Sequence, residues 1–362
     1  MAQDCRTAIH RLKTMVAYQK FIGASEVNEF GQAFNHIAQA LVDGRAQFLF
    51  GAGMSRESGL PIGSGLAEAL LQQFFPKSGG GVAPSDQRLQ NLAAEFPLEA
   101  IVHAVEQKPG CKREDLTKAL KQLLVDPNPK PNAGHEAFLG LLGARPRVKA
   151  IFTTNYDTLF EQALGPDICT PIVEKNATEI DRVRDAGKIP IIYLRGKLDG
   201  EYQITEPDIV TDRFRLLTEE FKSALHYAEA FVFVGFSLSD MDFRQIYLTF
   251  LEQLRARGTS GKTTYFVSPP NDEFSYALGS AIWKLRQALW VPLNAKDFFI
   301  TLKEVVENRA LDGIRSAVKA AYNVNDAQLS ELIDRTANVW RLNKQDALVV
   351  LYDNRTLIGG KK

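Results

Sequence analysis

The sequence predicts an α/β protein built on a parallel sheet of about six strands, with helices on both of its faces. Short runs rich in Val, Ile, Phe and Tyr recur at residues 46–50, 148–153, 189–194, 230–234, 263–267 and 288–293. The stretches between them are long enough for right-handed crossover connections. Continuous apolar strands that alternate with helical segments are typical of a parallel sheet covered on both faces.

Helical patterns account for most of the remaining chain. Phe30, Phe34, Ile37 and Leu41 lie on one face of a first helix, and Gly44 stands at its C-cap position. Further helices are predicted at about 64–75, 86–108, 113–125 and 133–143. The expected organisation is a helical extension over 1–28, an α/β domain over 29–305 with a helical insertion at 64–145, and a C-terminal helical segment over 306–362.

Composition excludes several classes of protein. Of the 362 residues, 45% are hydrophobic and 24% are charged, which is close to globular averages. The 43 basic side chains equal the 43 acidic ones, which argues against a nucleic-acid or membrane-surface footprint over the whole chain. No apolar run approaches the ~20 residues that span a bilayer, and no secretory signal is visible. We therefore expect a cytoplasmic protein with no membrane contact and no direct nucleic-acid binding.

The three cysteines are isolated, since Cys5, Cys111 and Cys169 form no Cys-x-x-Cys pair. A disulfide framework and a cysteine-built zinc site are therefore not expected, and a reducing compartment fits the sequence.

Small and polar residues follow three of the predicted strands. These segments are Gly51-Ala52-Gly53-Met54-Ser55 with Ser58-Gly59-Leu60-Pro61, then Thr153-Thr154-Asn155-Tyr156-Asp157, then Gly235-Phe236-Ser237-Leu238-Ser239-Asp240. In an open parallel sheet, ligands bind beyond the carboxyl ends of the strands. Glycines let a backbone approach a phosphate, and amide, hydroxyl and carboxylate groups can hold a ribose or a carboxamide. Each segment taken alone could instead be a tight turn or a helix cap.

Taken in order, these segments resemble the sirtuin superfamily. The first is similar to the family's Gly-Ala-Gly-x-Ser…Ser-Gly-x-Pro loop, and Pro131 to His135 is similar to its Pro-x-x-x-His. Thr154, Asn155 and Asp157, followed by Leu159, Ala163 and Gly165, are similar to Thr-x-Asn-x-Asp-x-Leu-x-x-x-Ala-Gly. Gly235, Ser237 and Leu238 match Gly-x-Ser-Leu. The resemblance covers about residues 33–305.

The resemblance implies a Rossmann-like domain with a helical small domain, and NAD as the substrate, cleaved between nicotinamide and ribose. By position, Asn155 would bind the nicotinamide ribose and orient a water, and Asp157 would hold the carboxamide. The set implied to bind NAD is Gly51, Ala52, Gly53, Ser55, Ser58, Thr154, Gly235 and Ser237. His135 would pack structurally.

Two departures from the family pattern refine this expectation. The zinc ribbon of sirtuin deacylases cannot be built from three scattered cysteines. The chain therefore resembles the zinc-free bacterial branch, which acts in anti-phage defence by hydrolysing cellular NAD. For that branch we expect no metal, and assembly as a homo-oligomer or with a partner defence protein.

The second departure is Arg195, which stands where the family has its catalytic His in Leu-His-Gly. A guanidinium has no acceptor site and stays charged, so it cannot serve as a base. Three explanations stay open: an inactivating substitution, a degenerate domain, or another group serving as base. Candidates for that group are His103, His226 and Tyr193.

The predicted function is a NAD glycohydrolase that gives nicotinamide and ADP-ribose and depletes cellular NAD, inactive in this chain because of Arg195. The alternative is a degenerate module that binds NAD or ADP-ribose within a multi-protein defence complex. A protein deacylase or ADP-ribosyltransferase is disfavoured by the missing zinc ligands, and no residues suited to hydride transfer indicate a dehydrogenase.

Overall fold

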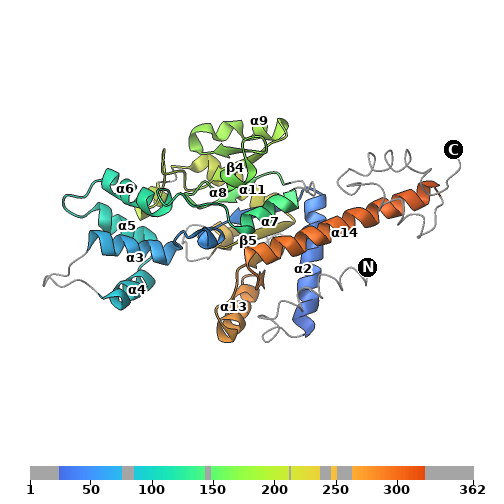
Figure 1. Cartoon of the computed structure of the whole chain (residues 1–362), viewed down its shortest axis with the longest axis horizontal. Helices are drawn as coiled ribbons and strands as arrows, with labels where there is room; N and C mark the ends of the chain where they lie inside the picture. The colour runs from blue at the N-terminus through green and yellow to red at the C-terminus, as the bar shows by residue number, and fades with distance from the viewer. Residues whose placement is uncertain are drawn as a thin grey trace. The chain divides into compact units, whose positions relative to one another are not determined.

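The chain folds around a parallel β-sheet, as the sequence predicts. The computed structural model describes residues 24–75, 85–142, 148–211, 213–236, 246–250 and 263–322. Within these ranges the sheet has seven strands in the order β3-β4-β2-β1-β5-β6-β7. Strands β4 and β5 are labelled in Figure 1. The strands are β1 (Ala46–Phe50), β2 (Ile151–Thr153), β3 (Cys169–Ile172), β4 (Ile189–Tyr193), β5 (Ala230–Val234), β6 (Thr263–Val267) and β7 (Ala288–Val291).

The seventh strand, β3, is the one that the sequence prediction of about six strands omits. It lies at the edge of the sheet and pairs in parallel with β4. Its sequence contains Thr170 and Pro171, and only its two end residues are buried. Proline is tolerated at an edge, where one side of the strand makes no ladder bonds, so an edge strand can lack the apolar run that marks an inner strand.

Helices occupy both faces of the sheet. The helices in the described residues are α2 (Ala24–Val42), α3 (Gly63–Phe74), α4 (Asp86–Glu95), α5 (Leu98–Glu106), α6 (Arg113–Leu124), α7 (Ala133–Leu142), α8 (Leu159–Leu164), α9 (Ile180–Asp185), α10 (Glu206–Val210), α11 (Arg215–Tyr227), α13 (Glu273–Leu285) and α14 (Ala295–Tyr322). Short 3-10 helices are η1 (Ala52–Met54), η2 (Arg56–Ser58) and η3 (Glu174–Glu179).

Aromatic contacts show which helices cover which face. Leu49 of β1 pairs with Phe152 of β2, so Phe50 and Phe152 point to opposite faces. Phe50 packs on Phe160 of α8, whereas Phe152 packs on Phe221 of α11. Helices α8 and α11 therefore lie on opposite sides of the sheet.

Four helices of the stretch predicted as an insertion form a helical cluster. Helices α3, α4, α5 and α6 lie together (Figure 1). The stretch predicted as one helix over 86–108 is two, because the chain is extended at Phe96 and Pro97. The apolar core of the cluster is continuous with the segment after β4 through Leu198, Tyr202 and Ile204. The insertion is thus anchored beside the end of β4.

The chain divides into two compact units. One comprises the residues up to Ala46, Ala137–Val148 and the residues from Lys296 onward, and the other comprises Gln47–Glu136 and Lys149–Ala295. Within the first unit, Phe34 of α2 packs on Phe298 of α14. Gly44 ends α2 with a φ of 70°, in agreement with its predicted C-cap role.

The terminal extensions fall mostly outside the described residues. Residues 1–23 and 323–362 are not described, and helix α14 runs through the predicted boundary at 305. Over the described part of the chain, no helix combines the length and apolar character needed to cross a bilayer.

Candidate functional site

The glycine loop lies where the strand order changes direction. Strand β2, which follows β1 in sequence, lies next to β1 on one side, and β5 lies next to β1 on the other side. A crevice at such a switch point is the usual ligand site of an open α/β sheet. Here Gly53 and Gly235, which has a φ of +61°, approach each other so closely that a Cβ at Gly235 would lie 2.3 Å from the Met54 nitrogen. The glycines are therefore required by the contact between the two loops.

The backbone N–H groups of this loop are largely engaged within the protein. Gly51 N donates to Val234 O at 3.0 Å, and Gly53 N donates to Gly235 O at 2.8 Å. These bonds hold the β1 and β5 loops together. The implied role of the loop in cradling a pyrophosphate stays a prediction, and Ala52, Gly53 and Ser55 of the implied set border the cavity described below.

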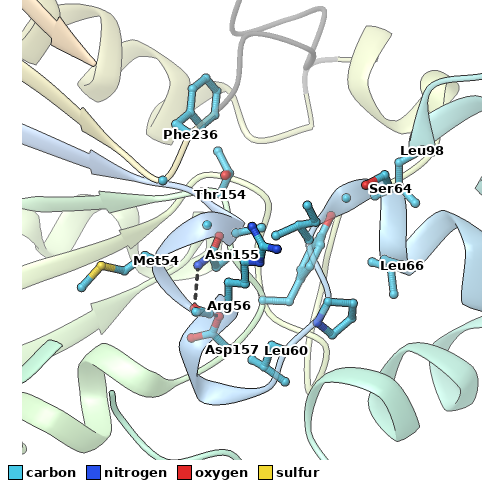
Figure 2. A pocket seen from close by; sticks show the side chains of 18 of the residues that line it. Met54, Arg56, Leu60, Ser64, Leu66, Leu98, Thr154, Asn155, Asp157 and Phe236 are labelled. Atoms are coloured by element: carbon cyan, nitrogen blue, oxygen red, sulfur yellow. Dashed lines mark hydrogen bonds between the residues drawn. The ribbon is translucent and has the colours of Figure 1, made fainter. Parts of the chain in front are cut away.

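The loop after β2 carries a buried polar cluster of Ser55, Asn155 and Asp157. Asn155 Nδ2 donates to Gly51 O at 3.2 Å and to Ser55 Oγ at 3.1 Å, and Ser55 Oγ donates to Asp157 Oδ2 at 2.7 Å. The second Asp157 oxygen accepts from Leu159 N at 3.1 Å. Figure 2 shows Asn155 and Asp157 at this strand end. The bonds fix both side chains at the carboxyl edge of the sheet.

The carboxyl group of Asp157 has a shifted pKa. Burial raises the pKa of its carboxyl group, and the hydrogen bonds from Ser55 and Leu159 only partly oppose this shift. Perturbed carboxyl groups in cavities are candidates for functional groups.

Arg195 follows β4 and lines the same cavity as Asp157. It is 4% exposed, and its Nη2 is 3.7 Å from Glu99 Oε1 of α5. A buried guanidinium needs compensating charge, and Glu99 supplies it from the helical insertion.

One cavity of about 1090 Å³ brings these groups together. Of the residues predicted to form the site, those that line it are Ala52, Gly53, Ser55, Thr154, Asn155, Asp157, Arg195 and Gly235. Figure 2 labels Thr154, Asn155 and Asp157. Gly51 and Ser58 do not line it. Ser58 Oγ instead accepts from Asn132 Nδ2 at 3.1 Å. Ser237 lies outside the described residues.

The cavity also contains residues that the sequence analysis did not single out. Polar ones are Arg56, Glu57, Ser64, Glu99, Ser268 and Asn294, and the insertion adds Leu66 and Leu98. Arg56 lies within the glycine-loop segment and could have been considered there. Glu99 sits mid-insertion with no motif around it, so only the tertiary fold places it.

The other ionisable candidates, His103, His226 and Tyr193, are not among the lining residues of the cavity. The Tyr193 hydroxyl donates to Asp157 O at 3.3 Å. His135 is 1% exposed and meets the edge of Phe160, and burial lowers its pKa to about 4. Its placement fits a packing role.

No group of three or more His, Cys, Asp or Glu suited to a metal ion occurs in the ranges that the structure describes. That the protein works without metal stays a prediction.

A comparison with family models matches part of the α/β region. Residues 149–285 match the family model of the SIR2-like domain. This match includes Asn155, Asp157, Arg195 and Gly235. No curated protein matches the chain.

Two of the similar solved structures are Sir2 proteins. A Sir2 enzyme described for its mechanism and regulation is 16% identical, with a TM-score of 0.43 over 76% of this chain and 97% of its own. A Sir2 homologue in complex with NAD has the same identity and TM-score over 77% of this chain and 94% of its own.

Proposed function

We propose that the cavity binds NAD and that the domain has the architecture of a NAD glycohydrolase, which cleaves NAD to nicotinamide and ADP-ribose. The observation that carries the proposal is that Asn155, Asp157 and Arg195 line one cavity with the glycine loop at the switch point. Its volume, about 1090 Å³, is at the upper end of ligand sites and suits a dinucleotide. The SIR2-like match over residues 149–285 supports the choice of NAD.

The reaction requires the site to position a water, to stabilise the positive charge that develops on the ribose, and to accept a proton from the water. Water attacks C1′ of the nicotinamide ribose, the C1′–N bond breaks, and the bond electrons neutralise the pyridinium as nicotinamide leaves. Positive charge develops on the ribose, and a proton from the water must pass to an acceptor. A desolvated carboxylate and fixed dipoles stabilise such a charge more strongly than water does.

Asn155 and Asp157 meet the first two requirements. The Asn155 amide is oriented by its two Nδ2 bonds, so its oxygen can position the water or a ribose hydroxyl. Asp157 offers a buried carboxylate to the carboxamide and to the developing charge.

Arg195 fails the third requirement. Its guanidinium cannot accept a proton, and its positive charge opposes the one on the ribose. We therefore propose that cleavage by this chain is slow. A role in anti-phage defence through NAD depletion rests on the resemblance to the zinc-free branch alone.

The second candidate function is a module that binds NAD or ADP-ribose without cleaving it. The buried ion pair between Arg195 and Glu99 favours it, because the arginine is compensated from a second element. A guanidinium also forms strong paired hydrogen bonds with phosphate.

The test is nicotinamide release from NAD by the unaltered chain and by Arg195→His, with NAD affinity measured by calorimetry. A positioned base supplies about 10²–10⁴-fold, so the histidine variant should cleave at least about 10²-fold faster. Asn155→Ala in that variant should abolish the gain. Equal rates in both chains would show that Arg195 is not at the catalytic position. NAD binding without cleavage by either chain supports the binding module, and no binding by either overturns both candidates.

A further inference from the structure

Helix α13 is apolar on two of its faces. One face packs on the sheet: Tyr276 is 4% exposed, Gly279 abuts Trp290 of β7, and Trp283 stacks on Phe266 of β6 with ring centroids 3.7 Å apart. A helix on the surface of a sheet needs only this one apolar face, because the other is in water.

The second face is exposed and still apolar. It forms a stripe, here called the α13 stripe, of Phe274, Ala277, Leu278, Ala281, Ile282 and Leu285. Phe274 is 77% exposed and Leu285 is 79% exposed. The spacing of i, i+3, i+4, i+7, i+8 and i+11 is that of one helix face, so the side chains are contiguous. Single exposed apolar residues are ordinary, whereas contiguous patches mark interaction sites.

The α13 stripe is complementary to itself in the antiparallel direction. With a twofold axis level with the bond between Gly279 and Ser280, each large side chain meets a small or matching one on the other helix. Phe274 then faces Leu285, Leu278 faces Ala281, and Ile282 faces Ala277. Large opposite small residues let two helices approach closely and interlock.

The charges at the two ends of α13 also favour antiparallel pairing. Asp272 and Glu273 stand at the N-terminal end, and Lys284 and Arg286 stand at the C-terminal end. Antiparallel pairing brings Glu273 of one copy to Arg286 of the other, whereas parallel pairing would bring like charges together. A membrane surface is disfavoured as the occupant because the ends carry no cationic excess.

We propose that the α13 stripe is a docking surface for a second copy of this chain, paired through antiparallel α13 helices about a twofold axis. An isologous contact of this kind uses the same patch on both partners. The patch is one 13-residue helix face, so the contact is small and the dimer is weak, with a Kd in roughly the micromolar range. This inference does not depend on the proposed function, since it concerns a surface apart from the lining residues of the cavity.

Sedimentation equilibrium of the full chain over a range of concentrations tests the proposal. Leu278→Asp and Leu285→Asp should each weaken the dimer by about tenfold or more, because each places a charge in the contact twice. Tyr227→Asp is the matched control: Tyr227 is 76% exposed on α11 and should leave the dimer unchanged. All three positions are exposed, so urea unfolding should show no loss of folding. A chain that is monomeric at high micromolar concentration, or self-association that Leu278→Asp leaves intact, overturns the proposal.

A charge-reversal pair tests the direction of the helices. Glu273→Arg and Arg286→Glu should each weaken the dimer about two- to fivefold at low salt, as expected for exposed ion pairs. The double variant should recover the original Kd. Failure of the double variant to recover would overturn the antiparallel arrangement.

Discussion

Two aspartates of this protein have similar exposed fractions but opposite pKa shifts. Asp157 is 9% exposed and Asp208 is 7% exposed. Burial raises the pKa of the Asp157 carboxyl, and hydrogen bonds oppose that shift without cancelling it. Burial acts in the same direction on Asp208, but bonds from Ile204 N, Arg113 and Thr205 N overcome it and lower its pKa. Asp157 lies deeper within the protein, and Asp208 has a cationic partner in Arg113, so both differences contribute to the opposite signs of the two shifts.

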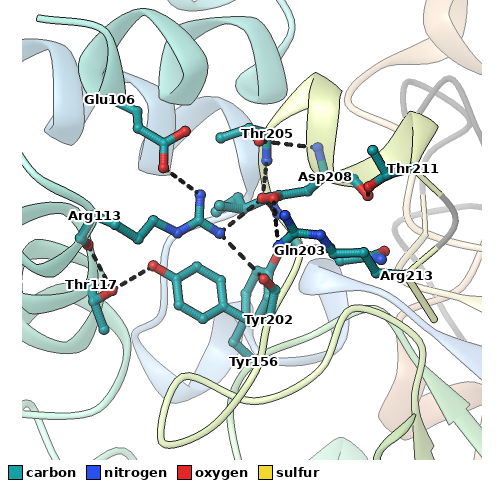
Figure 3. Close-up of polar contacts among 11 residues, drawn as sticks. Glu106, Arg113, Thr117, Tyr156, Tyr202, Gln203, Thr205, Asp208, Thr211 and Arg213 are labelled. Carbon is teal, nitrogen blue, oxygen red and sulfur yellow. Dashed lines mark hydrogen bonds and ion pairs between the residues drawn. The ribbon is translucent and has the colours of Figure 1, made fainter.

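Asp208 belongs to a polar cluster that joins the insertion to the segment after β4 (Figure 3). Its Oδ2 accepts from Arg113 of α6 at 2.8 Å and from Ile204 N and Thr205 N at 3.2 Å each. Arg113 also pairs with Glu106 at 3.0 Å. The charge of Asp208 is thus neutralised within the protein, which suits a structural contact.

Asp157 has hydroxyl and backbone donors, and among the described residues no ion pair involves it. It also borders the cavity, whereas Asp208 does not. A carboxylate that keeps part of its charge uncompensated is unfavourable for folding and is available to a ligand. The comparison indicates that Asp208 stabilises the fold, and it supports the proposed role of Asp157 in NAD cleavage.

The largest effect should come from Asp157→Asn in the Arg195→His background. Removing a preorganised charge should lower the rate of nicotinamide release by about 10²-fold, and NAD affinity should change less. Stability should stay within about 1 kcal/mol, since an amide can keep the Leu159 bond and meet the Ser55 hydroxyl. Single-turnover kinetics and urea unfolding separate these effects. A large loss of stability with unchanged turnover would reverse the roles assigned to the two aspartates.

The matched variant, Asp208→Asn, should have the opposite profile. We expect a loss of about 2 kcal/mol in the free energy of unfolding, because the charge-assisted bond to Arg113 weakens while that guanidinium stays partly buried. NAD affinity should not change. The urea midpoint and calorimetric NAD binding measure the two quantities, and a weaker affinity at unchanged midpoint would contradict the structural role.

The sequence predicted one of these aspartates and not the other. Asp157 follows a buried strand in a segment with Asn155, so local pattern and strand order suffice to place it at the carboxyl edge. Asp208 and Arg113 are separated by 95 positions in the sequence, and neither stands in a motif. Their pairing depends on how the insertion docks beside β4, which is a tertiary result.

The same distinction holds across the fold. Inner strands such as β5 could be predicted because burial on both faces requires a continuous apolar run, as in Ala230–Val234. The edge strand β3 lacks that requirement. In the site, Arg195 could be predicted from its place after β4, whereas its partner Glu99 could not, because helix α5 has no pattern that indicates which residue faces the cavity.

Asp157 and Asp208 should also differ in how their contributions to stability depend on pH. A group with a raised folded pKa stabilises the fold at low pH and loses that contribution as pH rises through the folded pKa. The stability of Asp157→Asn relative to the unaltered chain should therefore increase as pH rises above 3.8, the ordinary pKa of an aspartate. Asp208 has a lowered pKa, so its contribution should be present above its ordinary value of 3.8 and be lost only as pH falls below it. Urea unfolding of each variant at several pH values measures both trends. A gain for Asp157→Asn that shrinks with rising pH would contradict the raised pKa.

The smallest expected effect concerns two tyrosines whose rings meet edge to face, 6.2 Å apart. The Tyr202 hydroxyl lies 2.6 Å from Thr117 Oγ1, and Thr117 itself donates to Arg113 O, so Tyr202 is the donor. Tyr202→Phe removes this bond but keeps the ring under the Arg113 guanidinium, whose carbon is 4.5 Å from the ring centroid. We expect a loss of about 1 kcal/mol in stability and no change in NAD affinity.

Tyr156→Phe is the matched change on the cavity side of this pair. The Tyr156 hydroxyl donates to Gln203 O at 2.5 Å, and Tyr156 lines the cavity, whereas Tyr202 does not. Its loss should therefore cost a similar amount of stability, since it leaves a backbone oxygen without that donor, and should also weaken NAD binding. Equal NAD affinity in both variants, measured by calorimetry, would show that the cavity tolerates movement of the segment after β2. The boundary between the structural cluster and the ligand site would then lie closer to Asn155 than we propose.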